Sequence, residues 1–117
     1  MTFGGVCITT NDATGLVSFY QVLLQEEPIV DGDHYSFSKL AIWNSGNSEM
    51  KTCSNIWLQF VSPDIDTLYA RIMKEIPHIS ILSPPERKPW GAYSFWIHDP
   101  DGNSIAVAQM DEIMPLE

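Results

Sequence analysis

Residues 90–107 decide the fold of this chain and read WGAYSFWIHDPDGNSIAV. Asp99 can cap a tight turn with its carboxylate, and Gly102 can adopt the positive φ that such a turn needs. On both sides of the turn, apolar residues alternate with others in the period-2 pattern of half-buried strands: Phe95, Ile97, Ile105 and Val107. The stretch predicts a β-hairpin with one face on a core and the other face available for chemistry.

The overall composition limits the class of protein. The chain has 117 residues, is 44% hydrophobic and carries a formal net charge of −9, which fits one globular domain with a real core. The acidic balance argues against nucleic acid and anionic membranes as partners, and it is compatible either with a cationic ligand or with a surface that is simply acidic for solubility. No signal-peptide pattern or membrane-spanning run is present, so we expect a cytoplasmic protein. Cys7 and Cys53 are too few for a disulfide framework, and each is predicted to be a small buried hydrophobe.

The first half of the chain predicts a strand, a helix and three short strands. Residues 6–10 are β-rich, and Asn11 or Asp12 can cap the helix that follows. The apolar residues then fall at helical spacing up to the break at 26–28: Leu16, Phe19, Tyr20, Leu23 and Leu24. Antiparallel strands are predicted in 29–30, 34–38 and 39–43, followed by a polar linker at 44–49.

The second half repeats this plan. A strand is predicted at 55–61, with Ser62 as the helix N-cap and Pro63 at the first helical position. An apolar stripe indicates a helix that Pro77 stops, and a strand at 79–82 precedes a loop at 84–89 rich in proline and charge. The hairpin closes the unit, and residues 110–117 are interpreted as a polar tail.

The repeated plan, read together with 18–20, 64–69, 89–91 and 99–105, resembles the vicinal oxygen chelate superfamily. This superfamily includes glyoxalase I, extradiol dioxygenases, fosfomycin-resistance enzymes and bleomycin-resistance proteins. The resemblance implies an α+β fold of two tandem β-α-β-β-β modules, whose eight strands curve into a cup. It implies a single glyoxalase-like domain over 1–117, with modules at about 3–46 and about 54–110, and a homodimer with or without exchanged modules.

The resemblance also implies where a metal would bind. Enzymes of the superfamily hold a divalent ion in the cup through His, Glu or Gln on the first and last strands of each module. The matching positions here are Gly5, Ala41, Trp57 and Ala106. None of these residues offers a metal ligand, and neither does Trp43, the alternative to Ala41. Cys7 and His98 remain as isolated donors, so we expect no metal and no other cofactor.

No other catalytic arrangement is indicated by the sequence. A Gly-rich phosphate loop followed by a helix is absent, and no spacing suggests a nucleophile with its base. No catalytic residue is therefore assigned, and the sequence favours a protein that is not an enzyme while leaving that point open.

Aromatic side chains are the main feature of the predicted cup. Strand parity places Trp43, Trp57 and Trp96 on its inner side, with Trp90 at the rim. Adding their neighbours, the candidate ligand-binding residues are Trp43, Trp57, Trp90, Trp96, Tyr35, Cys7 and Gln59. Indole rings bind flat or cationic guests by stacking and cation–π attraction, and they also commonly fill a cavity or a dimer interface.

The sequence thus predicts a non-catalytic small-molecule binding protein of the bleomycin-resistance type. Such a protein sequesters an aromatic or cationic compound in a Trp-lined dimer cup, which is how this type confers antibiotic resistance. Two alternatives stay open. One is a metal-dependent lyase, isomerase or dioxygenase with displaced ligands, and the other is a structural or regulatory dimer whose cavity is plugged.

Overall fold

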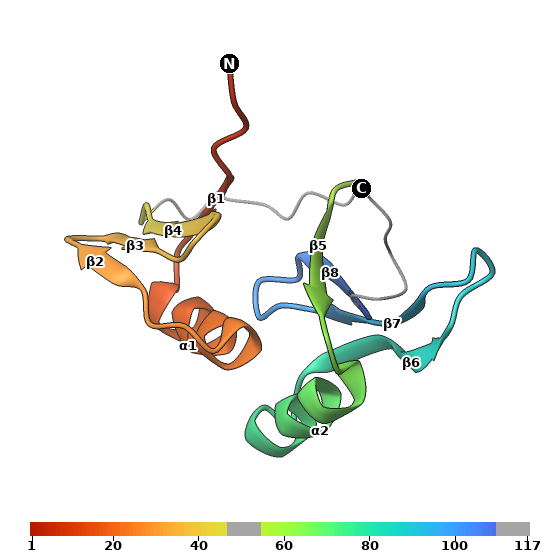
Figure 1. Cartoon of the computed structure of the whole chain (residues 1–117). Helices are drawn as coiled ribbons and strands as arrows, with labels where there is room; N and C mark the ends of the chain where they lie inside the picture. Colours follow the sequence, from red (N-terminus) through yellow and green to blue (C-terminus); the bar gives the residue numbers. More distant parts are fainter. Residues whose placement is uncertain (47–54, 110–117) are drawn as a thin grey trace. The chain divides into compact units, whose positions relative to one another are not determined.

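The chain consists of two compact units, Met1–Lys51 and Thr52–Glu117 (Figure 1). The computed structural model describes residues 1–46 and 55–109. Each unit has the order β-α-β-β-β with its own four-stranded mixed sheet, so the predicted α+β fold of two modules is confirmed. The closure of both sheets into one eight-stranded cup stays a prediction. Within the described residues, no helix has the length and apolar character needed to cross a membrane.

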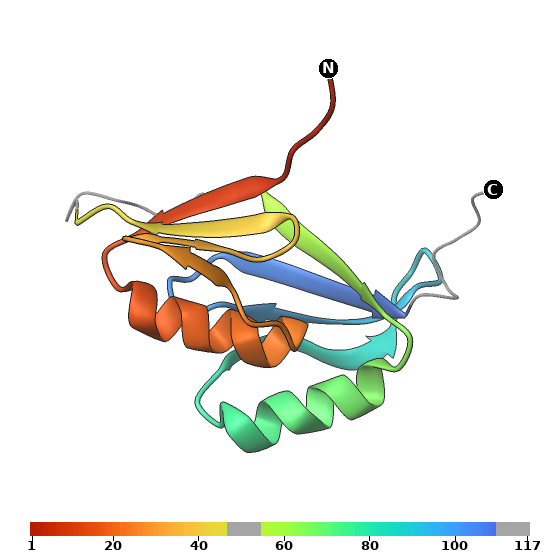
Figure 2. The same cartoon turned by 60° about the vertical axis from the view of Figure 1, so that its left-hand side comes forward.

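The first unit packs one helix on one face of its sheet (Figure 2). Its elements are β1 (Val6–Thr10), α1 (Ala13–Leu24), β2 (Ile29–Asp31), β3 (His34–Ser36) and β4 (Leu40–Asn44). The strand order is β1-β4-β3-β2, with β1 parallel to β4 and the other pairs antiparallel. Asp12 caps α1, because its carboxylate accepts a hydrogen bond from the backbone N–H of Gly15. The predicted apolar stripe of α1 is buried at Leu16, Phe19, Tyr20 and Leu23.

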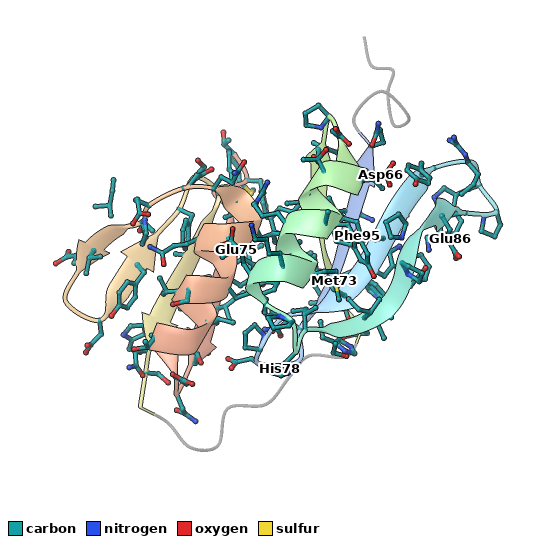
Figure 3. The ribbon with its side chains drawn as sticks, turned by 90° about the horizontal axis from the view of Figure 1, so that it is seen from below. Asp66, Met73, Glu75, His78, Glu86 and Phe95 are labelled. Carbon is teal, nitrogen blue, oxygen red and sulfur yellow. The ribbon has the colours of Figure 1, made fainter. Side chains whose placement is uncertain are left out.

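The second unit repeats this arrangement with longer strands. Its elements are β5 (Trp57–Ser62), α2 (Ile65–Glu75), β6 (Ser80–Arg87), β7 (Tyr93–His98) and β8 (Ser104–Gln109). The strand order is β5-β8-β7-β6, with β5 parallel to β8. Figure 3 shows α2 lying across the face of the sheet that carries Phe95. The Phe95 ring is fully buried, and its centroid lies 5.2 Å from that of Tyr69 on α2.

The hairpin of β7 and β8 forms as predicted. Phe95 pairs with Val107 and Ile97 with Ile105, and all four side chains are buried. In the turn, the Asp99 carboxylate accepts hydrogen bonds from the backbone N–H groups of Asp101 (3.0 Å) and Asn103 (2.8 Å). Gly102 has the expected positive φ, of 90°. The turn therefore fixes the register of the last strand.

Helix α2 begins later than predicted. Its N-cap is Asp64, whose carboxylate accepts hydrogen bonds from the Thr67 hydroxyl (2.7 Å) and the Thr67 backbone N–H (3.2 Å). The side-chain hydrogen bond from Thr67 is the main cause that lowers the pKa of Asp64. Ser62 instead ends β5, and its hydroxyl accepts a bond from the Asp64 N–H. The prediction of Ser62 as cap and Pro63 as first helical residue is therefore wrong, since Ser62 is held in the sheet.

Strand β6 is longer than predicted. It runs through Pro84 and Pro85 to Arg87, where the sequence predicted a loop. The strand lies at the end of the sheet, and its pairing with β7 shifts register between Ile81 and Ser83 and again between Ser83 and Glu86. Proline is tolerated at such irregular positions of an edge strand, because its missing N–H removes no regular ladder bond. The proline-based prediction of a loop is therefore wrong over residues 84–87.

The predicted linker at 44–49 begins one residue too early, because Asn44 is the last residue of β4. Residues 47–49 of the linker lie outside the described residues. The predicted tail at 110–117 and Cys53 also lie outside them. Cys7 is an exposed free cysteine, so its predicted burial is wrong. The reason is strand parity, because Cys7 alternates with Val6 and Ile8 and faces away from α1.

Candidate ligand-binding pocket

A pocket of about 770 Å³ opens in the second unit. It lies on the face of the sheet opposite α2, which we call the open face. Three tryptophans line it, Trp57, Trp90 and Trp96, together with the polar residues Gln59 and Ser94. Four of the seven predicted ligand-binding residues thus line one pocket.

The sheet register explains why two of the tryptophans meet. Gln59 of β5 lies opposite Ala106 of β8, which in turn lies opposite Trp96 of β7. Trp57 stands two residues before Gln59 and so projects from the same face. The centroids of the Trp57 and Trp96 rings are 5.2 Å apart at an interplanar angle of 66°, an edge-to-face contact across the small side chain of Ala106.

Trp90 reaches the pocket from the connection between β6 and β7. Its ring stacks on Trp96 with a centroid separation of 6.0 Å and an interplanar angle of 15°, while 67% of the residue stays exposed. The connection is closed by backbone hydrogen bonds of 2.8 Å from Lys88 to Ala92 and from Gly91 to Lys88. Gly91 has a φ of 102°, which few other residues adopt. Trp90 is therefore an ordered but exposed wall of the pocket.

A buried lysine lies against the central indole. The ammonium nitrogen of Lys88 is 4.1 Å from the centroid of the Trp96 ring, and only 4% of the residue is exposed. The ammonium donates hydrogen bonds to the Ser83 hydroxyl and to the Glu86 carboxylate, the latter at 3.2 Å. The hydrogen bond from Lys88 is the main cause that holds the pKa of Glu86 below its usual value. Figure 3 shows Glu86 on β6 at the edge of the unit.

The contact between Ser83 and Lys88 has the residue types of a serine nucleophile and its base. The Lys88 ammonium also contacts the Glu86 carboxylate and the face of the Trp96 ring. Neither Ser83 nor Lys88 is among the residues that line the tryptophan pocket. The contacts of Lys88 therefore support the Trp96 ring from outside the pocket.

The residues present do not fit the metal that the superfamily resemblance implies. Trp57 and Ala106, at two of the expected ligand positions, carry no donor atom for a metal. At Gly5, a third position, any β-carbon would overlap the carbonyl oxygen of Lys39. Among residues 1–46 and 55–109, no three His, Cys, Asp or Glu side chains gather closely enough to hold a metal ion.

The remaining predicted site residues belong to the first unit. Cys7 pairs with Ala41 and Thr9 with Trp43, so Cys7 and Trp43 project from the same face of that sheet, and Trp43 is 46% exposed. Tyr35 pairs with Ile42, whose side chain is fully buried. Because directly paired residues share a face, Tyr35 and Trp43 lie on opposite faces of the first sheet.

The sequence analysis missed one polar lining residue, Ser94, and one residue that contacts the tryptophans from outside the pocket, Lys88. Ser94 could have been predicted from strand parity, because it stands two residues before Trp96 and must share its face of the sheet. The contact of Lys88 with the Trp96 indole could not have been predicted, because it depends on the conformation of a proline-rich strand end.

Solved structures resemble this chain over nearly its whole length. A protein of unknown function from Agrobacterium tumefaciens str. C58 is 28% identical, with a TM-score of 0.78 over 92% of this chain and 93% of that one. A glyoxalase/bleomycin resistance protein/dioxygenase family enzyme from Burkholderia phytofirmans PsJN is 16% identical, with a TM-score of 0.72 over 92% and 98%. A member of that superfamily from Sphaerobacter thermophilus DSM 20745 is 20% identical, with a TM-score of 0.65 over 92% and 96%.

Sequence comparison gives a matching family model. The model of the glyoxalase-like domain matches residues 3–112, which is nearly the whole chain. No curated protein matched the chain.

Proposed function

We propose that this chain, which belongs to the glyoxalase-like domain family of the glyoxalase/bleomycin resistance protein/dioxygenase superfamily, is a non-catalytic binding protein for a small aromatic or cationic compound. The observation that carries the proposal is the set of three indole rings around one pocket, Trp57, Trp90 and Trp96. Each ring offers a flat apolar surface to a planar guest, and such ring contacts contribute about 0.5–1.5 kcal/mol beyond the burial of area.

Charge supports an aromatic or cationic guest in two ways. The net charge of −9 attracts cations from solution. The Trp96 ring already interacts with Lys88, so cation–π attraction for a guest comes mainly from Trp57 and Trp90. Stacking is therefore the contact common to all three walls, and a charge on the guest is an addition to it.

The chemistry of the ligand positions supports binding without catalysis. Trp57 stands where the resemblance places a metal ligand, and it contributes an indole face to the pocket instead. Ala106 leaves space beside that face, where a Glu would extend into the pocket. The two residues that lack a metal donor, Trp57 and Ala106, therefore both line the proposed binding site.

The proposal is tested by titration of the protein with ethidium, a cationic planar dye, and with acridone, a neutral planar compound. We expect quenching of tryptophan fluorescence and a raised melting temperature. Trp57→Ala should weaken binding about tenfold, equal to about 1.4 kcal/mol. Leu82→Ala on β6 is the matched control, since Leu82 is exposed and is not a lining residue.

Two results would contradict the proposed function. The first is that neither compound changes the fluorescence or the melting temperature of the wild-type protein. The second is elemental analysis of the purified protein that finds Mn, Fe, Ni or Zn in a one-to-one ratio, which would favour the metal-dependent enzyme instead.

A further inference from the structure

Ser94 is a polar residue of the pocket whose buried hydroxyl has no hydrogen-bond partner in the described part of the chain. It lies on β7, is only 3% exposed, and is one of the residues that line the tryptophan pocket. Its hydroxyl oxygen is buried and has no hydrogen-bond partner among residues 1–46 and 55–109. Buried hydroxyl groups in folded proteins are nearly always hydrogen-bonded, because burial without a partner costs the group its interaction with water. The exception at Ser94 therefore calls for a further partner beyond the described residues, and a bound guest can supply it.

The neighbours of Ser94 on the side of β8 are small. Across β8 its paired residue is Ala108, and the residue paired with Trp96 is Ala106. Both alanines line the pocket, as does Ala92, two residues before Ser94. Small side chains thus flank Ser94 on the side of β8, whereas its paired residue on β6 is Glu86. The indole of Trp96 stands two residues further along β7.

Gln59 provides a second polar group in the pocket. It lies on β5, two strands from β7, which places it about 10 Å from the line of Ser94 and Trp96. The residue is exposed, and it lines the same pocket. The two polar groups therefore border the tryptophan walls on different sides, at a spacing comparable to the length of two or three fused aromatic rings.

We propose that the tryptophan pocket selects planar aromatic compounds that carry a hydroxyl or carbonyl group on the ring edge, and that the buried Ser94 hydroxyl is the specificity-determining residue that hydrogen-bonds to this group. This inference rests on the proposed binding function. The ring of the guest lies against the indoles, and its polar edge points at Ser94. A hydroxyl both donates and accepts, so either group on the guest completes its bonding.

The test compares two probes of nearly equal shape, 2-naphthol and 2-methylnaphthalene, by tryptophan fluorescence titration. We expect wild-type protein to bind 2-naphthol about tenfold more tightly than 2-methylnaphthalene. Ser94→Ala should remove this preference by weakening 2-naphthol alone. Its melting temperature without ligand should be unchanged or raised, because the substitution removes a buried hydroxyl that lacks a partner.

Ser104→Ala is the matched control. Ser104 is on the neighbouring strand β8, in register with Trp57 and His98, and it is not a lining residue. This variant should keep the wild-type preference. If both probes bind equally to wild type and to Ser94→Ala, the role of Ser94 is overturned while the binding function stands. If neither naphthalene binds wild type but ethidium, which carries no hydroxyl or carbonyl group, does, the inference alone fails; if none of the four compounds binds, the proposed function fails with it.

Discussion

At Gly5 the backbone leaves no space for a side chain. The residue has a φ of 133°, and a β-carbon there would overlap the Lys39 carbonyl oxygen, which also accepts a hydrogen bond from the Val6 N–H. We expect Gly5→Ala to reduce the free energy of unfolding by about 1–3 kcal/mol, measured by urea denaturation. Gly4→Ala is the matched control, because a β-carbon at Gly4 meets nothing within 4 Å. An equal free energy of unfolding for Gly5→Ala and Gly4→Ala would contradict the predicted overlap with the Lys39 carbonyl oxygen.

Glu86 makes the stability of the second unit depend on pH. Hydrogen bonding from Lys88 lowers the pKa of Glu86 from its ordinary value of 4.5, so the folded state favours the carboxylate. The resulting stabilisation is fully present above pH 4.5 and is lost as the pH falls through the lowered folded-state pKa. We expect the wild-type protein to lose more stability than Glu86→Gln between pH 7 and pH 3, as measured by urea denaturation at both values. A loss of the same size in both proteins would argue against this role.

The sequence predicted the site residues that follow from strand parity alone. Trp57, Trp96 and Gln59 could be placed together because side chains alternate along a strand and the hairpin turn fixed the register. The contact of Lys88 with Trp96 could not be predicted in this way, because it depends on the path of the residues before β7. The Ser94 hydroxyl has no hydrogen-bond partner among the described residues, and this could not be predicted either, because it depends on how all neighbouring side chains pack.

At the scale of elements, the turn between β7 and β8 depends on one buried carboxylate. Asp99 is 3% exposed and bonds both the backbone N–H and the side-chain amide of Asn103, as well as the Asp101 N–H. Asp99→Ala leaves these donors without their charged acceptor, so we expect a loss of about 2–4 kcal/mol in the free energy of unfolding. Asp31→Ala, on the exposed strand β2, should change it by less than about 0.5 kcal/mol in the same measurement. An Asp99→Ala variant with the same free energy of unfolding as the wild type would show that the turn forms without this carboxylate.

The elements that sequence patterns predicted well are those with strong periodicity. Both helices and the hairpin strands carry apolar residues at regular spacing, and their buried faces agree with it. Boundaries were predicted less well where two residues compete for one role. Ser62 and Asp64 are both good caps, and only the pairing of Ser62 with Gln109 across the sheet decides between them. Pro84 and Pro85 indicated a loop because sequence alone does not reveal that their strand is at the sheet edge.

At the scale of the whole molecule, the repeated pattern predicted two modules because each half contains its own amphipathic helix and strands. The superfamily resemblance further leads us to propose a homodimer. Light scattering after size-exclusion chromatography should give twice the mass of one chain at micromolar concentration. The mass of one chain over the whole concentration range would contradict the dimer without affecting the pocket, whose lining residues all belong to the second unit.

The two prolines of β6 also limit how this protein can aggregate. An edge strand with free N–H and C=O groups is a template onto which a strand of another molecule can add. In β6 two consecutive residues lack the N–H group, and the irregular register with β7 interrupts the regular spacing of the others. A foreign strand therefore finds no continuous set of donors along this edge, which makes β6 a poor template for the addition of strands from other molecules.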